Sequence, residues 1–248
     1  MNYKISIITV VKNSALSIEK CIQSVIGQNY KNIEYIIIDS NSNDGTSEII
    51  KKYKDKISVI VNEQDSGIWD AMNKGLSLAK GDIIGFLNAD DYYYSNALEL
   101  VNNYFCNNEI DFLFGSVEKY KLMHGFNPDI IKWSFGFYTS HSVGFFIKTK
   151  KHKQVGFYNP KFLSADLDFF YKMIIDFNLK GCASKKNEIF GKFGSGGFSS
   201  KINYIDHLKD LNEIRISNKQ NKFFVYFLYY IKILKKPIKF FKSYFKKN

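Results

Sequence analysis

The fold is indicated most clearly by the stretch Gly81-Asp82-Ile83-Ile84-Gly85-Phe86-Leu87-Asn88-Ala89-Asp90-Asp91. Its apolar run, Ile83 to Leu87, is typical of a strand buried on both faces, and it stops abruptly at polar and acidic residues. A strand delivers its last side chains to a fixed place. The carboxylates of Asp90 and Asp91 are therefore expected at the edge of a sheet.

Three earlier apolar runs, residues 4–11, 33–38 and 57–61, have the same character. Helix-like segments separate them, and connections of that length require parallel pairing. We therefore predict an α/β fold with an open, mostly parallel, Rossmann-like sheet flanked by helices. Ligands bind such sheets at the carboxyl ends of the strands. The residues at these strand ends, which are expected to share one crevice, are Thr9, Val11, Asp39, Glu63, Asp65 and Asn88 to Asp91.

The regular alternation weakens after Asp91. Further elements are predicted as helices at 95–105, 166–178 and 204–217 and a fifth strand at 111–115. Residues 116–150 have no clear period, and we expect short strands and loops that cover the crevice. Residues 191–200 hold four glycines and three serines, which is typical of a flexible loop or lid over a bound donor.

The 248 residues are enough for one large domain with appendages. The three cysteines, Cys21, Cys106 and Cys182, have no paired spacing, which argues against a disulfide framework or a zinc site and fits a reducing compartment. No signal-peptide pattern opens the chain.

The net charge of +11 is concentrated in residues 219–248, which hold nine lysines and no acidic residue. Their apolar residues follow helical spacing: Phe227, Ile231, Leu234, Ile238, Phe241 and Phe245. This predicts a basic amphipathic helix, broken or kinked at Pro237, that binds an anionic membrane surface but is too short to span it. The alternative is a helix packed on the body with solvated lysines.

Acidic residues at a strand end suit a divalent cation, because Mg²⁺ takes one or two protein carboxylates plus substrate phosphates. The alternative for Asp90 and Asp91 is a polar turn that caps the helix beginning near Ser95. Asp39 could accept hydrogen bonds from a nucleobase or a ribose. Alternatively, Asp39 and Asp44 are turn and cap residues.

Four segments in order resemble family 2 glycosyltransferases of the GT-A fold: Ile5 to Val10 with Asn13, Ile36 to Thr46, Asp65 to Gly75, and Gly81 to Asp91. The resemblance spans about residues 3–200. The third and fourth segments look like the variant seen in bacterial exopolysaccharide and colanic-acid-type enzymes. The resemblance implies an enzyme that transfers a sugar, with inversion and with a metal ion, from a nucleoside-diphosphate sugar. The donor would be a UDP-sugar, and the acceptor would be a surface polysaccharide or a lipid-linked oligosaccharide.

The same resemblance implies residue roles. Donor-binding residues would be Thr9, Val11, Asp39, Asp65, Asn88, Ala89 and Asp90. Asp90 would bind Mn²⁺ or Mg²⁺. Asn88 stands where the family often has a first aspartate, and Met72 stands where many relatives carry an arginine near the phosphates.

The segment from Ala165 to Phe169 resembles the family's Glu-Asp-X-Asp motif, which makes Asp166 the general base, although it could simply cap its helix. Asp168 would help to position the site without contacting the substrate. Contacts to phosphate or acceptor are expected from His141, Asp70 and Lys74, and the alternative for His141 is a structural role.

These expectations divide the chain into a GT-A domain, 1–218, and a membrane-binding tail, 219–248. A nucleotide-sugar-binding half would span 1–115 and an acceptor-side half 116–218. We expect a cytoplasmic protein, peripheral on the inner face of the cell membrane. A nucleic-acid-binding protein is the alternative, but the lysines lie in the tail and Arg215 is the sole arginine, so no nucleic-acid partner is expected. A dinucleotide-dependent oxidoreductase would need a glycine-rich turn where Lys12 to Ala15 stand.

Overall fold

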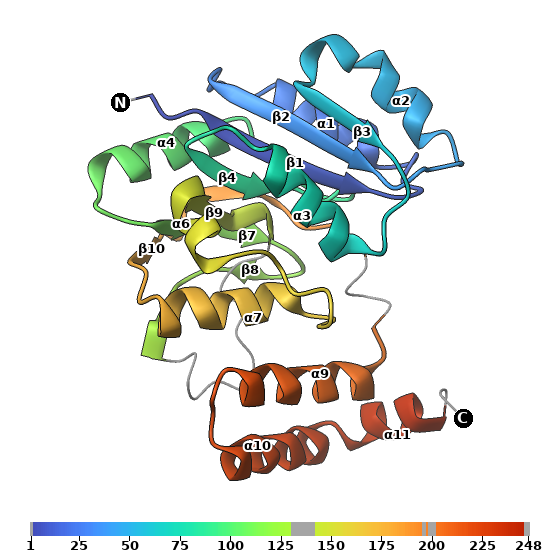
Figure 1. Cartoon of the computed structure of the whole chain (residues 1–248), viewed down its shortest axis with the longest axis vertical. Helices are drawn as coiled ribbons and strands as arrows, with labels where there is room; N and C mark the ends of the chain where they lie inside the picture. The colour runs from blue at the N-terminus through green and yellow to red at the C-terminus, as the bar shows by residue number, and fades with distance from the viewer. Residues whose placement is uncertain (1, 130–141, 195–196, 198–201, 246–248) are drawn as a thin grey trace. The chain divides into compact units, whose positions relative to one another are not determined.

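The computed structural model describes residues 2–129, 142–194, 197 and 202–245 (Figure 1). The chain packs as two compact units. The first comprises residues 1–126, 138–157 and 179–195, and the second comprises residues 127–137, 158–178 and 196–248.

The first unit is built on a seven-stranded sheet with the order β10-β6-β9-β4-β1-β2-β3. Its strands are β1 (Ile5–Val11), β2 (Ile33–Asp39), β3 (Val59–Asn62), β4 (Ile83–Phe86), β6 (Phe112–Phe114), β9 (Phe145–Lys148) and β10 (Gly181–Ala183). All run parallel except β9, which is antiparallel to β4 and β6. The predicted mostly parallel α/β sheet is confirmed, and β1 to β4 lie within two residues of their predicted bounds.

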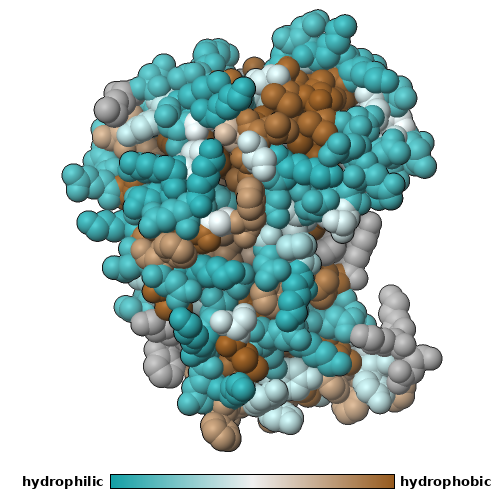
Figure 2. Space-filling model, viewed as in Figure 1, coloured by the Kyte–Doolittle hydropathy of each residue, from teal (hydrophilic) through white to brown (hydrophobic). Residues whose placement is uncertain are grey.

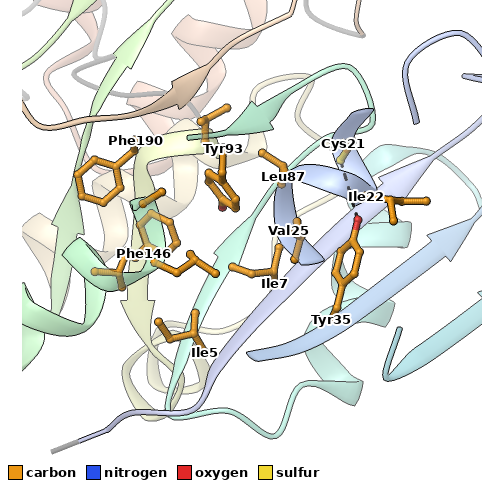
Figure 3. Close-up of a cluster of buried hydrophobic side chains, with 14 of the residues drawn as sticks. Ile5, Ile7, Cys21, Ile22, Val25, Tyr35, Leu87, Tyr93, Phe146 and Phe190 are labelled. Atoms are coloured by element: carbon orange, nitrogen blue, oxygen red, sulfur yellow. Dashed lines mark hydrogen bonds between the residues drawn. The ribbon is translucent and has the colours of Figure 1, made fainter. Parts of the chain in front are cut away.

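Helices cover both faces of this sheet. They are α1 (Ile18–Ile26), α2 (Thr46–Lys52), α3 (Ile68–Leu78), α4 (Ala97–Asn107) and α6 (Thr149–Val155), with the short 3₁₀ helices η1 (Lys54–Lys56) and η2 (Ser142–Gly144). Successive strand side chains point to opposite faces. Ile7 packs with Ile22 and Val25 of α1 in the core cluster drawn in Figure 3. Its neighbour Ile8 meets α3 at Gly75, where an added Cβ would lie 2.4 Å from the Ile8 Cγ2.

A second, four-stranded sheet has the order β5-β11-β7-β8. It comprises β5 (Tyr92–Tyr93), β11 (Ile189–Lys192), β7 (Ser116–Glu118) and β8 (Leu122–Met123). The prediction for residues 116–150 was incomplete, because β9 is an inner strand of the main sheet and α6 follows it. The loop predicted at 191–200 was wrong at its start, since Gly191 and Lys192 belong to β11. Residues 195–196 and 198–200 of that loop lie outside the described residues.

The second unit is helical in its described parts. It contains α7 (Ala165–Tyr171), which continues as the π-helical turn η3 (Lys172–Asp176), then α9 (Tyr204–Ser217), α10 (Lys222–Lys235) and α11 (Pro237–Phe245). The helix bounds predicted for 204–217 are confirmed. The predicted break at Pro237 is present, because this residue opens α11, a position where its missing N–H costs nothing. In the described residues, no helix has the combined length and apolar character needed to cross a bilayer.

Candidate donor and metal site

The carboxyl ends of the central strands meet at one edge of the main sheet. Val11 pairs with Asp39 across β1 and β2, and Asp39 pairs with Asn62 across β2 and β3. On the other side of β1, Ile8 pairs with Phe86. The loop that follows β4 therefore starts at the edge where Val11 and Asp39 end, which is where open α/β sheets bind ligands.

Asp91 holds the loop after β4 to two distant segments. Its Oδ1 accepts from the Gly194 backbone N–H at 2.8 Å, and its Oδ2 accepts from the Ser142 hydroxyl at 3.4 Å. Within the loop, the Asp91 N–H donates to the Asn88 carbonyl at 3.0 Å. The side chain is 1% exposed. Burial, together with the neighbouring Asp90 carboxylate, raises the pKa of Asp91 to about 8.

Two oxygens of this loop, Asn88 Oδ1 and Asp90 Oδ2, are buried and receive no hydrogen bond from the described residues. The Asn88 amide is oriented by its Nδ2, which donates to Ser142 Oγ at 3.2 Å. Leaving a buried acceptor unmatched costs about 1–3 kcal/mol, and more for a charged group. Such a cost is recovered when a cation or a donor group binds there.

The donor set of the loop fits a hard divalent cation. An amide oxygen and the Asp90 carboxylate supply the oxygen ligands that Mg²⁺ and Mn²⁺ prefer. The described residues contain no group of three or more His, Cys, Asp or Glu side chains that could enclose a metal. The loop therefore resembles the open sites in which one or two protein ligands leave the remaining positions to substrate phosphates.

Gly194 was missed as a structural partner of this loop. A Cβ at this position would lie 2.2 Å from the Asp90 carbonyl oxygen, so only glycine permits the approach. The glycine-rich run from 194 to 197 was a visible signal, but it was interpreted as part of a lid. Ser142 was missed as well, and no local pattern distinguishes it.

Asp39 is almost fully buried at the end of β2 and organises the loop between β2 and α2. Its Oδ1 accepts from the Ser42 N–H at 3.1 Å and from the Ser42 hydroxyl at 2.5 Å. Its Oδ2 accepts from the Ser47 hydroxyl. A carboxylate has about four acceptor positions, so about one remains for a ligand.

Three other predicted pocket residues are buried at or near the same edge. The Thr9 hydroxyl lies in the core, 3.2 Å from the Tyr35 hydroxyl, because Thr9 shares its face of β1 with Ile7 under α1. The structure therefore places this side chain in the core and not at the strand end. Val11 is buried, and its carbonyl accepts from the Ser40 N–H at 2.9 Å. Ala89 is also buried.

Lys74 binds three groups in and next to the loop that leads into α3. Its ammonium contacts Glu63 Oε1 at 2.9 Å, Asp70 Oδ2 at 3.5 Å and the Gln64 carbonyl at 3.2 Å. The hydrogen bond to Glu63 raises the pKa of Lys74. Asp70 and Asp65 accept backbone N–H groups of this loop, from Ser66 and Gly67 respectively, each at 3.0 Å. These residues stabilise one another, and the structure gives Lys74 a role in ordering the loop.

In the second unit, Asp166 lies in the first turn of α7. Its Oδ1 accepts from the Leu167 N–H at 2.9 Å. Burial raises the pKa of Asp166 to about 6, and the charge of Asp210 adds to the rise. A carboxylate with this pKa is basic enough to accept a proton near neutral pH.

Two further aspartates support the start of α7. Asp168 accepts from Lys172 at 2.7 Å and from the Asn218 amide at 2.8 Å. Asp210 of α9 accepts from the Leu163 and Ser164 N–H groups, both at 2.8 Å. Asp210 was missed, because it comes from a helix more than 40 residues further along the chain. His141, which was predicted to contact phosphate or acceptor, lies outside the described residues.

A mostly parallel α/β sheet with acidic and amide oxygens at its carboxyl edge fits the class of nucleotide-sugar-dependent transferases of the GT-A fold. The sequence model of the family described as "Glycosyl transferase family 2" matches residues 6–175. That is more than half of the chain. The chain belongs to this family and carries its glycosyltransferase domain.

Curated relatives include bacterial glycosyltransferases. The chain is 34% identical over 118 residues to the UDP-Glc:alpha-D-GlcNAc-diphosphoundecaprenol beta-1,3-glucosyltransferase WfgD of Escherichia coli, covering 47% of each chain. It is 41% identical over 95 residues to WfaP of the same species, which has the same activity in its name, covering 38% of each chain. The matched part thus spans less than half of each of these relatives.

Solved structures share the fold at low sequence identity. S. aureus TarS 1-349 in complex with UDP-GlcNAc aligns with a TM-score of 0.70 and 17% identity, over 86% of this chain and 66% of that one. The mannosyltransferase PcManGT from Pyrobaculum calidifontis, in complex with GDP-Man and Mn²⁺, aligns with a TM-score of 0.68 and 15% identity, over 89% and 65%. Both likenesses concern the fold alone.

Proposed function

We propose that this protein transfers a single sugar from a nucleoside-diphosphate sugar, a UDP-sugar, to a saccharide acceptor, with inversion at the anomeric carbon and with a divalent cation. The observation that carries the proposal is the pair of buried, unmatched oxygens, Asn88 Oδ1 and Asp90 Oδ2, at the carboxyl edge of a GT-A sheet. These acceptors are suited to a cation that a diphosphate also contacts.

Asn88 and Asp90 are the residues proposed to hold Mn²⁺ or Mg²⁺. Such a cation, when bound, neutralises negative charge on the departing nucleoside diphosphate. Asp91 keeps the loop in place through Gly194 and Ser142, so that the Asp90 carboxylate stays available for binding. This division of work explains why two adjacent aspartates have different surroundings.

The nucleotide part of the donor is proposed to lie along the ends of β1 and β2. Asp39 retains an acceptor position for a base or ribose group, and Ala89 and the main chain at Thr9 and Val11 supply surface around it. Asp65, Asp70 and Lys74 are proposed to contribute through the loop that they order. Lys74 is already engaged by two carboxylates, so a phosphate would have to compete with Glu63 and Asp70.

Asp166 is proposed as the general base. Inverting transfer needs a group that removes the proton from the acceptor hydroxyl as that oxygen attacks the anomeric carbon opposite the leaving group. A pKa of about 6 keeps Asp166 largely deprotonated at pH 7 while leaving it more basic than an ordinary aspartate. His141 is proposed to contact phosphate or acceptor.

The acceptor is proposed to be a lipid-linked oligosaccharide or a surface-polysaccharide precursor. Support comes from the names of the two E. coli relatives, which specify a GlcNAc-diphosphoundecaprenol acceptor. An acceptor held by a membrane lipid is met by an enzyme at the membrane surface, here the inner face. We propose that residues 1–218 perform the transfer and that residues 219–248 make contact with the membrane.

A binding panel tests the proposal. The intact protein is heated with UDP-, GDP- and dTDP-sugars, each with and without Mn²⁺, and the unfolding temperature is recorded. A ligand that binds only the folded state raises this temperature. We expect a rise for a UDP-sugar that depends on the metal. If no nucleotide sugar raises the unfolding temperature, or if the rise is the same with and without Mn²⁺, the proposed donor site is wrong.

A further inference from the structure

The outward faces of α10 and α11 are strongly apolar. Nine of the fifteen large hydrophobic side chains that are exposed in the described residues lie in these two helices. On α10 they form a stripe at helical spacing, Phe223, Phe227, Tyr230 and Leu234, and the first and last are 88% and 77% exposed. Figure 2 shows hydrophobic side chains among hydrophilic ones on this surface. Exposed apolar surface of this extent marks an interaction site.

The opposite faces of the two helices are packed within the second unit. Val225 and Leu228 of α10 are buried where this helix meets α9. The Tyr204 hydroxyl donates to the Lys232 carbonyl at 3.2 Å, and the Asn203 amide donates to the Ser243 carbonyl at 3.1 Å. The start of α9 is therefore hydrogen-bonded to both later helices. The apolar stripe belongs to a folded platform and not to a loose tail.

Lysines border the stripe. Residues 219–248 contain nine lysines and no acidic residue. Lys236 and Lys242 are exposed, and neither forms an ion pair with an acidic side chain in the described part of the chain. The combination of exposed aromatic residues with unneutralised lysines matches the interface of an anionic bilayer, where rings enter the headgroup region and ammonium groups meet lipid phosphates.

The platform is also connected to the proposed base. Asp210, on the same helix α9, accepts the N–H groups of Leu163 and Ser164, which immediately precede α7. Asp166 lies in the first turn of α7. A surface that fixes α10 and α11 therefore also fixes, through α9, the segment that carries Asp166.

We propose that the outward faces of α10 and α11 dock in the plane of an anionic lipid bilayer, and that α9 transmits this placement to the start of α7. The helices have 14 and 9 residues, which suits lying along the interface and not crossing it. This inference rests on the proposed sugar transfer only for its purpose, which is to present the base to an acceptor carried by a lipid.

Vesicle co-sedimentation tests the docking face without any sugar substrate. The intact chain is mixed with vesicles of phosphatidylcholine alone or of equal parts phosphatidylcholine and phosphatidylglycerol, at an ionic strength of about 0.15 M. We expect binding to the anionic vesicles, weakening as salt rises. Phe227→Glu and Tyr230→Glu are expected to lower the affinity about tenfold or more, because each places a charge in the apolar face.

Matched controls separate the docking face from general surface effects. Phe157 of the first unit is 61% exposed, close to the 59% of Phe227, and Phe157→Glu is expected to bind anionic vesicles like the unmodified chain. Lys236→Glu with Lys242→Glu is expected to weaken binding about tenfold or more, whereas Lys54→Glu with Lys56→Glu on η1 leaves it unchanged. Unfolding temperatures confirm that each variant is folded.

Two results would overturn the inference. One is an unmodified chain that fails to bind anionic vesicles. The other is a folded Phe227→Glu variant that binds them as the unmodified chain does. Neither result bears on sugar transfer, which is tested separately by the metal-dependent binding of a UDP-sugar. Conversely, vesicle binding together with absent UDP-sugar binding would leave the docking surface intact and remove the proposed function.

Discussion

At the scale of single residues, the adjacent aspartates Asp90 and Asp91 have different tasks. Asp91 is enclosed and accepts hydrogen bonds from Gly194 and Ser142, while Asp90 keeps an unmatched oxygen. The strand pattern placed both acids at a strand end, and only the family resemblance singled out Asp90 as the metal ligand. Their difference arises from contacts with residues about 50 and 100 positions away, which no local pattern contains.

The pH dependence of turnover tests Asp166. Burial raises its folded-state pKa to about 6, and a base must be deprotonated to act. Turnover at saturating donor is therefore expected to be level at pH 7–8 and to fall about tenfold per pH unit below about pH 6. Initial rates measured from about pH 4.5 to about pH 8 check this pH profile.

The matching variant is Asp166→Asn, which keeps the shape of the side chain and removes the base. It is expected to bind the donor normally and to lose at least about a hundredfold in turnover. Unchanged turnover in this variant, or an acid limb that stays at the same pH without Asp166, would remove it as the base.

At the scale of secondary-structure elements, the strands in clear apolar runs were predicted well, and the short strands in segments without a clear period were not. The apolar runs of β1 to β4 are long enough to be recognised, and helices separate them along the chain. β9 has four residues in a segment without a period, and it pairs with β4 and β6, which are both earlier in the chain. The pattern of β1 contained no signal that separates Thr9 from a pocket residue, because the strand is buried on both faces from Ile5 to Val11.

Gly194→Ala tests the contact between the end of β11 and the metal loop. The new Cβ would lie 2.2 Å from the Asp90 carbonyl oxygen, so the backbone of one segment must move. We expect a lower unfolding temperature and a weaker effect of Mn²⁺ on UDP-sugar binding. Thermal unfolding with and without metal measures both, and normal metal dependence in a folded variant would show that this contact does not position Asp90.

Asp210→Asn tests the link between α9 and α7. The variant can still accept one of the two N–H groups, but it removes the negative charge that raises the pKa of Asp166. We expect a loss of about 1–3 kcal/mol in stability and an acid limb of turnover that shifts to lower pH. A stability loss without any shift of the pH profile would reduce Asp210 to a structural support.

At the scale of the whole molecule, the predicted tail is integrated into a helical unit. Residues 219–248 were expected to form an amphipathic helix, broken or kinked at Pro237, with lysines on a neighbouring face. The break separates α10 from α11, but Lys232 is half-buried, with a pKa lowered to about 8 by burial and by the charge of Arg215. The helical spacing was visible in the sequence, but which face would meet α9 was not.

Two truncated chains test how much α10 and α11 contribute to the stability of the second unit. Ending the chain at residue 218 removes the buried Val225 and Leu228 from the surface of α9, and each such side chain contributes about 1.5–3 kcal/mol. Ending it at residue 236 removes only α11, which has no fully buried side chain. We expect the shorter chain to unfold at a clearly lower temperature than the longer one. Equal unfolding temperatures would mean that α10 adds nothing to the folded unit.

The proposed donor site depends on Asp90, which holds the cation that the donor diphosphate contacts. The most direct measurement is the unfolding temperature of the unmodified protein and of Asp90→Ala with UDP-sugar, with Mn²⁺ and with both, using Asp55→Ala on η1 as a control. We expect a rise of roughly 5–10 °C with both ligands at about a hundredfold excess over the dissociation constant. The rise should persist in Asp55→Ala and vanish in Asp90→Ala. An equal, metal-dependent rise in a folded Asp90→Ala protein would show that Asp90 does not hold the cation.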